Sequence, residues 1–253
     1  MDKTENYSGE NPEVKISLEE LITNTLENNG ITLREGAAET LAALSERLIA
    51  ANELINLTSV DTPEGVALLH FADSLTLLPY IKEGETLLDV GSGAGFPALP
   101  LAIAVQGLRV TALDATQKKV TFAADAAHTL GLRNFAALCG RAEELGSRQP
   151  YRERYDVVCA RAVAKLNVLC ELCMPFVRVG GRFIAMKSRA ASEEITQARQ
   201  ALTETGGEIA ENINLTLRGE GEELSRNIII IQKVAPTPKI YPRRYAQITK
   251  NPL

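Results

Sequence analysis

The 253-residue sequence contains no tryptophan, two histidines and four cysteines. No apolar run reaches the roughly 18 to 20 residues that a membrane-spanning helix requires, so no contact with a membrane is predicted. The first fifteen residues, MDKTENYSGENPEVK, are polar and acidic and lack the apolar core of a secretory signal peptide. The cysteines lie in apolar segments and are expected to be free thiols in the reducing cytoplasm. They are Cys139, Cys159, Cys170 and Cys173.

Acidic residues outnumber basic ones, and the net charge of −5 argues against general binding of nucleic acid. The charge is unevenly spread, however, because the segment 233–253 contains basic residues and no acid. A basic segment on an acidic body indicates a local anionic partner. The basic residues are Lys233, Lys239, Arg243, Arg244 and Lys250.

Apolar periodicity divides the chain into a helical part and an alternating part. Helix signals begin with a capping box at Ser17 and Glu20. After about residue 83, strands alternate with helices, which is typical of a parallel sheet covered on both faces. The predicted strands are 85–90, 109–113, 134–138, 155–160, 181–187, 212–217 and 226–233. The last two have no predicted helix between them and are expected to form an antiparallel hairpin at the sheet edge.

We therefore predict an α/β fold with a doubly wound, mostly parallel, seven-stranded sheet and an N-terminal helical cap. The sequence shows no internal repeat. The predicted parts are a disordered N-terminus at 1–15, a helical cap at 16–82, a sheet domain at 83–234 and a basic, proline-rich tail at 235–253 that packs on the same unit.

The stretch LLDVGSGAGFPALPLAIA, residues 87–104, runs from an apolar strand through a glycine turn into an apolar helix. Open parallel sheets bind ligands at such turns. No Gly-Lys-Ser/Thr follows, which excludes a P-loop, and Phe96 stands where a dinucleotide-binding loop has its third glycine. The G-x-G-x-G pattern after Asp89 favours S-adenosylmethionine, whose cationic amino acid can face that carboxylate. A tight turn without a ligand is the alternative.

Two further segments indicate an adenosine-containing cofactor. Asp114 ends the second strand, where a carboxylate can accept hydrogen bonds from both ribose hydroxyls. After the third strand, GRAEEL places Ala142 and Glu143 where an adenine ring would lie. Each segment also has a purely structural interpretation, as a solvated strand end or helix cap and as a plain helix start.

Together, DVGSGAGFPALPLAI, GRAEEL, YDVVCARAVAKL, VGGRFIAMKS, RNIIIIQK and TPKIYPRR…NPL resemble the glucose-inhibited division protein B family. INLTSV and HFADSL also look like family motifs, so the resemblance covers roughly residues 50–253. It implies a class I methyltransferase fold with S-adenosylmethionine as the methyl donor. The implied acceptor is N7 of a guanine in bacterial 16S ribosomal RNA, either as RNA or within the 30S subunit. No stable protein partner is predicted.

The expected cofactor contacts fall on the glycine turn, the end of the second strand, GRAEEL and the end of the fourth strand. They are Gly91, Gly93, Phe96, Asp114, Ala115, Thr116, Ala142, Glu143 and Arg161. The sequence departs from the family pattern in two places. Ala98 stands where many members have glycine, and RRYAQI replaces a commoner Arg-Lys-x-Gly-x-Pro tail, which puts the path of the tail in doubt.

Guanine N7 carries a lone pair and no proton, so methyl transfer to it needs alignment and exclusion of water but no general base. We accordingly predict no catalytic residue beyond positioning groups, and no metal. His70 is expected to be packed or hydrogen-bonded, and His128 to lie on a helix surface. Cys159 is followed by alanine rather than the proline beside a cytosine-C5 methyltransferase nucleophile, and is interpreted as core. Cys170 and Cys173 lack a second ligand pair and are also interpreted as core, not zinc ligands.

Basic residues after the fourth and fifth strands, joined by those of the tail, predict an RNA-binding surface at the cofactor edge of the sheet. They are Lys165, Lys187, Arg189, Lys239, Arg243 and Arg244. Tyr241 and Tyr245 can stack on unpaired bases, although packing of the tail onto the body is an equal alternative. Two other functions are alternatives: an NAD(P)-dependent oxidoreductase, for which the sequence offers no Tyr-x-x-x-Lys set, and a non-catalytic RNA-binding assembly factor.

Overall fold

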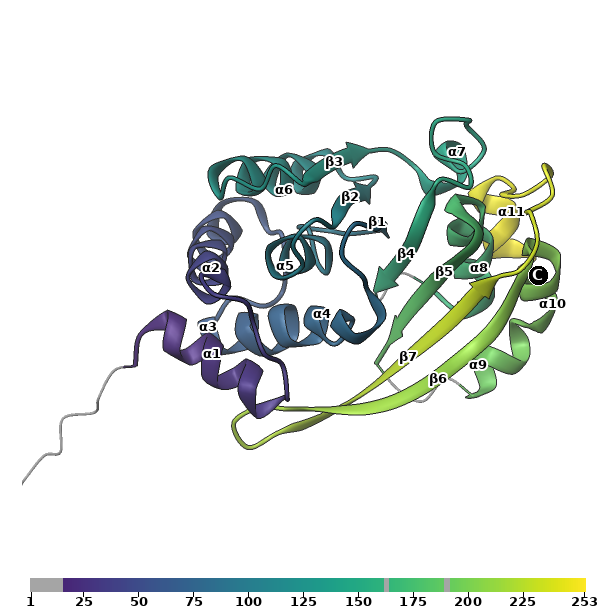
Figure 1. The fold of residues 1–253 in the computed structure, drawn as a ribbon. Helices are drawn as coiled ribbons and strands as arrows, with labels where there is room; N and C mark the ends of the chain where they lie inside the picture. The colour runs from purple at the N-terminus through teal and green to yellow at the C-terminus, as the bar shows by residue number, and fades with distance from the viewer. Residues whose placement is uncertain (1–15, 162–163, 189–191) are drawn as a thin grey trace, which may run out of the picture.

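The computed structural model describes residues 16–161, 164–188 and 192–253. At its centre is a seven-stranded sheet with the order β3-β2-β1-β4-β5-β7-β6 (Figure 1). The strands are β1 (Thr86–Val90), β2 (Arg109–Asp114), β3 (Phe135–Cys139), β4 (Tyr155–Arg161), β5 (Val177–Lys187), β6 (Gly207–Arg218) and β7 (Glu223–Lys233). Within the described ranges, no helix is both long and apolar enough to cross a membrane.

The strand directions confirm the predicted doubly wound, mostly parallel fold. β1, β2, β3, β4 and β5 pair in parallel, whereas β7 pairs antiparallel with both β5 and β6. β6 and β7 therefore form the predicted hairpin at the sheet edge. The later strand of the hairpin, β7, lies inside the sheet, and β6 forms the edge.

Both faces of the sheet are buried because apolar residues occupy successive positions on its central strands. In β1, Leu87 packs into one core and Leu88 into the other. In β7, Ile228 and Ile229 divide between the two cores in the same way. Successive side chains of a strand point to opposite faces, so such unbroken apolar runs require helices on both sides.

The cap begins with α1 (Leu18–Asn28) and α2 (Ala37–Ile55). As the capping box predicts, the Ser17 hydroxyl accepts a hydrogen bond from the Glu20 amide at 3.1 Å. Four short segments follow: α3 (Pro63–Gly65), the π-helical η1 (Val66–Ala72), α4 (Asp73–Leu75) and the 3₁₀ turn η2 (Leu78–Tyr80). Single π-helical turns are frequent at functional sites, and this one carries His70.

Helices cover the sheet on both faces. One core is shared by α1, α2, α5 (Ala98–Ala104) and α6 (Gln117–Thr129). The other is shared by α7 (Ala142–Leu145), α8 (Leu166–Cys173), the 3₁₀ turn η3 (Met174–Phe176), α10 (Arg199–Thr205) and α11 (Tyr245–Lys250). α9 (Ser192–Gln197) precedes α10 between β5 and β6. α9 and α10 were not expected from the sequence.

The tail packs on the body instead of extending from it, and α11 lies beside α8 (Figure 1). The Arg152 guanidinium donates to the carbonyl groups of Thr237 and Tyr241 at 2.7 and 2.9 Å. The Tyr241 side chain is buried, so it cannot stack on an RNA base in this conformation. Lys233 is also buried and is not part of an exposed basic segment.

The cysteines and His128 take structural positions. Cys159, Cys170 and Cys173 are buried in the two cores, which confirms their interpretation as core residues. Burial raises the pKa of the Cys170 thiol to about 12. Cys139 is exposed at the end of β3. His128 is exposed on α6, as predicted.

Candidate active site

Three glycines in the left-handed region shape the turn between β1 and α5. Gly91, Gly93 and Gly95 have φ angles of 74°, 58° and 99°, which other residues rarely adopt. The amides of Gly91 and Ser92 donate to the Leu113 carbonyl at 2.8 and 3.0 Å, which ties the turn to β2. Strand order reverses at β1, whose neighbours are β2 and β4. The turn therefore lies at the switch point where open sheets bind ligands.

Gly93 and Gly95 differ in what surrounds them. A Cβ atom on Gly95 would lie 2.6 Å from Leu99 Cδ1, so this glycine allows α5 to pack against the turn. A Cβ atom on Gly93 would meet no heavy atom within 4 Å. The Gly93 backbone thus borders open space, as it must where a ligand approaches the main chain.

Asp114 connects the glycine turn with the start of α6. One carboxylate oxygen accepts from the Gly93 amide at 2.9 Å, and the other accepts from the Thr116 amide at 2.8 Å. Ala115 separates Asp114, the last residue of β2, from Thr116, the residue before α6. A carboxylate has about four acceptor positions, so Asp114 can still accept hydrogen bonds from ribose hydroxyls.

Asp89, in β1, is completely buried. Its Oδ2 accepts from the Ala98 amide at 3.2 Å, whereas Oδ1 has no hydrogen-bond partner among the described residues. Burial raises the pKa of this carboxyl to about 7, although the Arg161 guanidinium acts in the opposite direction. A buried carboxyl with an unused oxygen fits the cationic amino group of S-adenosylmethionine.

The GRAEEL segment lies at the same edge of the sheet as Asp114. The Gly140 amide donates to the Asp114 carbonyl at 3.0 Å, and α7 begins immediately afterwards. Ala142 and Glu143 are its first two residues and are half-buried. The structure therefore brings the expected ribose and adenine contacts together. With Asp89 and Gly93, these groups fit an adenosine cofactor that carries a cationic amino acid.

Phe96 joins the glycine turn to the cap. Its ring stacks on the His70 imidazole, with centroids 4.4 Å apart and planes inclined by 14°. The Arg161 guanidinium carbon lies 6.0 Å from the Phe96 centroid. Burial, reinforced by the Arg161 charge, lowers the pKa of His70 to about 3, so the ring is neutral. The expectation of a packed, hydrogen-bonded histidine is confirmed.

Asp73, at the start of α4, binds two arginines from different strands. Its Oδ2 lies 3.0 Å from Arg161 Nη1 at the end of β4, and its Oδ1 lies 2.8 Å from Arg226 Nε on β7. Arg161 also donates to the Leu69 carbonyl at 2.8 Å. Neither Asp73 nor Arg226 was expected from the sequence to belong to the site. Both residues do lie in motifs that carry the family resemblance, since HFADSL contains Asp73 and RNIIIIQK begins with Arg226. Those motifs could have drawn attention to them.

These side chains line a cleft of about 510 Å³ between the cap and the carboxyl ends of β4 and β5. Thr58 and His70 come from the cap, Arg161 from β4, Lys187 from β5 and Arg226 from β7. Arg161 lines this cleft and also lies near Phe96 and Asp89. The glycine turn and the cleft are therefore adjacent compartments with a common wall.

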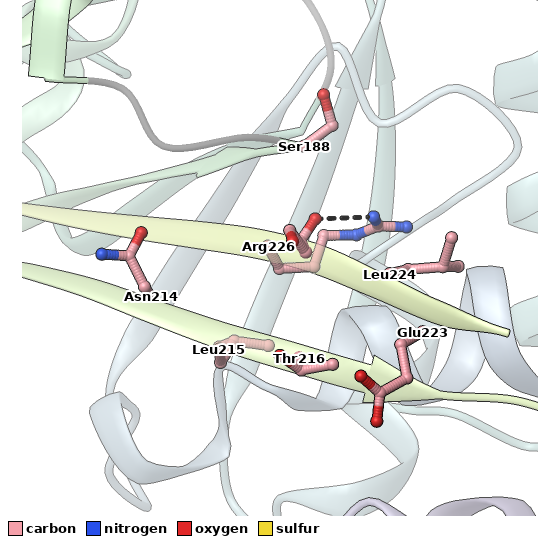
Figure 2. A pocket seen from close by; sticks show the side chains of 8 residues that line it. Ser188, Asn214, Leu215, Thr216, Glu223, Leu224 and Arg226 are labelled. Atoms are coloured by element: carbon pink, nitrogen blue, oxygen red, sulfur yellow. Dashed lines mark hydrogen bonds between the residues drawn. The ribbon is translucent and has the colours of Figure 1, made fainter.

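A second hollow, of about 620 Å³, continues from the cleft along the β6–β7 hairpin. The two share Ser188 and Arg226. Figure 2 shows Arg226 on β7, with its Nη1 hydrogen-bonded at 3.1 Å to the carbonyl of its neighbour Ser225. Polar side chains such as Asn214 and Thr216 line the floor on β6. The hollow therefore lengthens the cleft along the β6–β7 hairpin.

Of the basic residues that follow the fourth and fifth strands, Lys165 is exposed immediately before α8. Lys187 Nζ lies 2.7 Å from Glu194 Oε2 and donates to the Ala164 carbonyl at 2.7 Å. An ammonium has three hydrogens, and within the described ranges these two partners account for two of them. Arg189 lies outside the described residues.

Not all of the basic residues of the tail lie at the edge of the sheet that carries the glycine turn. Arg243 Nε and Nη2 bind the buried Glu171 carboxylate at 2.8 and 2.6 Å. The Pro238 carbonyl, next to Lys239, accepts from Arg152, which precedes β4. Because β4 spans about 20 Å, Lys239 lies at the opposite end of the strand from Arg161. The expectation that all tail charges share the cofactor edge is therefore wrong for Lys239.

Residues 37–224 match the family model for rRNA small subunit methyltransferase G. A ribosomal RNA small subunit methyltransferase G from Limosilactobacillus reuteri is 44% identical over 233 residues, which cover 90% of this chain and 96% of the relative. The protein belongs to this family. A second member, from Halalkalibacterium halodurans, is 43% identical over 230 residues and 96% of its length.

The fold of this rRNA small subunit methyltransferase G family member also occurs among solved structures. A SAM-dependent methyltransferase from Aquifex aeolicus is 20% identical, with a TM-score of 0.50 over 67% of this chain and 94% of that one. This likeness shows the class I fold alone. Family and fold together imply S-adenosylmethionine as the methyl donor, as predicted. They support a methyltransferase over the oxidoreductase and the non-catalytic factor.

Proposed function

We propose that this family member methylates N7 of a guanine in 16S ribosomal RNA. The donor binds at the glycine turn, and the guanine enters the cleft between the cap and the sheet. The observation that carries this arrangement is the position of Arg161. It lies over Phe96 at the glycine turn and pairs with Asp73 in the cleft, so the two compartments adjoin.

The proposed cofactor site combines the predicted residues with Asp89. Asp114 accepts hydrogen bonds from the ribose, Ala142 and Glu143 border the adenine, and Asp89 faces the cationic amino group. The open space beside Gly93 supports a close approach of the cofactor to the main chain. The full set is Asp89, Gly91, Gly93, Phe96, Asp114, Ala115, Thr116, Ala142, Glu143 and Arg161.

Methyl transfer to N7 requires the protein mainly to align the methyl donor with the base. S-adenosylmethionine supplies an electrophilic methyl group on a positively charged sulfur. Guanine N7 carries no proton, so no residue has to remove one, and the chain contributes orientation and exclusion of water. His70 agrees with this, because a side chain with a pKa of about 3 is too weak a base to act at neutral pH.

Methylation at N7 also limits how the base is held. Arginine often recognises guanine by donating to N7 and O6 together. A donor on N7 would occupy the lone pair that attacks the methyl group, so this pairing must be absent at the moment of transfer. Asp73 holds Arg161 and Arg226 along the wall of the cleft. We therefore assign the Arg226 guanidinium to the RNA backbone, whereas Arg161 stays among the cofactor contacts.

The proposed RNA surface surrounds the mouth of the cleft. Lys165 and Lys187 contribute directly, and Arg189 follows Ser188 of the cleft in sequence. Arg244 is exposed at the start of α11 and stays in the set. We assign Arg243 to holding the tail, since Glu171 and the Asn251 carbonyl take up its Nε and Nη2 hydrogens. Because Lys239 lies at the far end of β4, we assign it a minor contribution to RNA binding.

The substrate is ribosomal RNA, either free or within the 30S subunit, and no stable protein partner is required. The enzyme acts in the cytoplasm, where that RNA is present. The cap (16–82), the sheet domain (83–234) and the tail (235–253) act as one unit, which is supported by the contacts of Arg152 with the tail.

The direct test supplies methyl-labelled S-adenosylmethionine and small-subunit particles that lack the modification. We expect one label at N7 of a single guanine, located by strand scission specific for N7-methylguanine. Gly93→Val, which fills the space beside the turn, should abolish both labelling and cofactor binding. Label on a base other than guanine, or cofactor binding without transfer to any particle, would refute the proposed function.

A further inference from the structure

We assign the single ring proton of His70 from the groups around the ring. Arg161 Nη2 lies 3.4 Å from His70 Nδ1. A guanidinium can only donate, so Nδ1 must be the acceptor. The neutral ring then carries its proton on Nε2, which lies 3.0 Å from Thr58 Oγ1. His70 therefore donates to Thr58.

The Thr58 hydroxyl is consequently directed as a donor. Its oxygen accepts from His70 Nε2 and also from the Val60 amide at 3.1 Å. A hydroxyl oxygen has two lone pairs, and both are thereby occupied. Its own hydrogen has no acceptor among the residues that the structure describes, and Thr58 lines the cleft. The cleft thus contains a neutral donor of fixed polarity.

This donor stands close to the proposed methyl donor. Thr58 contacts one edge of the His70 ring, and the face of that ring stacks on Phe96 of the glycine turn. A neutral hydroxyl is favourable here, because a further cation beside the positively charged sulfur would be repelled. The charged groups of the cleft instead have carboxylate partners, Asp73 for the arginines and Glu194 for Lys187.

We propose that Thr58 determines the specificity for guanine by donating its hydroxyl hydrogen to O6 of the target base, and that His70 is a positioning residue that sets this polarity. The proposal rests on the proposed function. Guanine and adenine both present N7, but the neighbouring group is an acceptor, O6, in guanine and a donor amino group in adenine. A hydroxyl that can only donate therefore accepts guanine and opposes adenine.

The test is a thermodynamic cycle in which the Thr58 hydroxyl and the O6 atom of the base are removed separately and together. Thr58→Val and Thr58→Ser are compared with the wild type on small-subunit RNA that carries guanine, 2-aminopurine or adenine at the mapped target. 2-Aminopurine keeps N7 and the 2-amino group but lacks O6. We expect Thr58→Val to lower kcat/KM on guanine RNA by roughly 10- to 100-fold. It should leave kcat/KM on 2-aminopurine RNA unchanged, and Thr58→Ser should restore most of the loss.

Two further measurements separate recognition from folding. The affinity of Thr58→Val for S-adenosylmethionine should equal that of the wild type, and its preference for guanine over adenine should fall. Equal losses on guanine and 2-aminopurine RNA would overturn the proposal, because the hydroxyl would then support the cleft or contact another group. A wild type that does not methylate guanine N7 would instead refute the proposed function itself.

Discussion

His70 and Phe96 stack with their ring centroids 4.4 Å apart, which fastens the π-helical turn of the cap to the glycine turn of the sheet. Aromatic pairs contribute about 0.5–1.5 kcal/mol beyond the burial of their area. A change in the cap is therefore expected to reach the cofactor site through this contact.

The stack predicts energetic coupling between the two residues. In urea unfolding, His70→Gln, Phe96→Leu and the double variant should give a coupling energy of about 1 kcal/mol. Phe96→Leu should also raise the Kd for S-adenosylmethionine, whereas Phe176→Leu, in the opposite core, should not. Additive effects of the two single substitutions would contradict the coupling.

Asp89 predicts the pH dependence of cofactor binding. Its pKa of about 7 means that the unliganded carboxyl is increasingly protonated below neutral pH. Binding an ammonium group requires the ionised form, so the Kd should rise by up to about tenfold for each unit below pH 7. Above a pH of about 8, loss of the proton from the cofactor amino group should weaken binding again.

Calorimetric titrations between pH 5.5 and 8.5 measure this profile. Proton release on binding, obtained from buffers of different ionisation enthalpy, should accompany it at pH 6.5. Asp89→Asn should remove the acidic limb, whereas Asp125→Asn, at an exposed position of α6, should preserve it. A wild-type Kd that is constant from pH 5.5 to 7 would disprove the assignment.

The glycine turn allows a matched comparison of backbone strain and ligand contact. Gly93 and Gly131 have φ angles of 58° and 70°, and a Cβ at either position meets nothing within 4 Å. Alanine at either position should lower the unfolding free energy by about 1 kcal/mol. Only Gly93→Ala should weaken binding of S-adenosylmethionine, as measured by calorimetry.

Gly95→Ala should behave differently from both. It adds a contact of 2.6 Å with Leu99 to the backbone strain at a φ of 99°. We therefore expect a larger loss of stability than at Gly93. In the comparison of Gly93→Ala with Gly131→Ala, similar affinities for S-adenosylmethionine would show that the ligand does not occupy the open space beside Gly93.

The Arg243–Glu171 pair predicts that the tail contributes to stability. The Glu171 side chain is 1% exposed, so Arg243→Ala would leave a buried carboxylate without its charged partner, although the backbone amide at position 243 still donates to it. Such losses cost about 3 kcal/mol. Arg244→Ala, at the exposed neighbour, should change stability by less than about 0.5 kcal/mol. Urea unfolding measures both values.

For RNA affinity the two arginines are expected to matter in the reverse order, so that Arg244 contributes and Arg243 does not. The salt dependence of RNA affinity should lose about one unit of slope in Arg244→Ala and none in Arg243→Ala. A reduced slope for Arg243→Ala, measured where that variant remains folded, would return Arg243 to the RNA surface.

The sheet and the glycine turn were predictable because their signals are local. Apolar runs indicated the seven strands, and the glycine pattern with Asp89 and Asp114 indicated a candidate cofactor site. The Asp73–Arg161–Arg226 cluster was not predictable in this way, because its members come from the cap, β4 and β7. Their proximity depends on how the hairpin enters the sheet, which no local pattern specifies. For the same reason, the position of Lys239 could not be read from its charge.

The place of β7 between β5 and β6 has a consequence for biosynthesis. A chain leaves the ribosome from its N-terminus, so β6 emerges before the strand that must separate it from β5. Until residues 223–233 have emerged, β6 has no native neighbour, and Arg226 is missing from the wall of the cleft. The glycine turn at 91–95 is thus synthesised well before β7, which supplies Arg226 to the cleft. We expect the proposed RNA cleft to be the last part of the site to form.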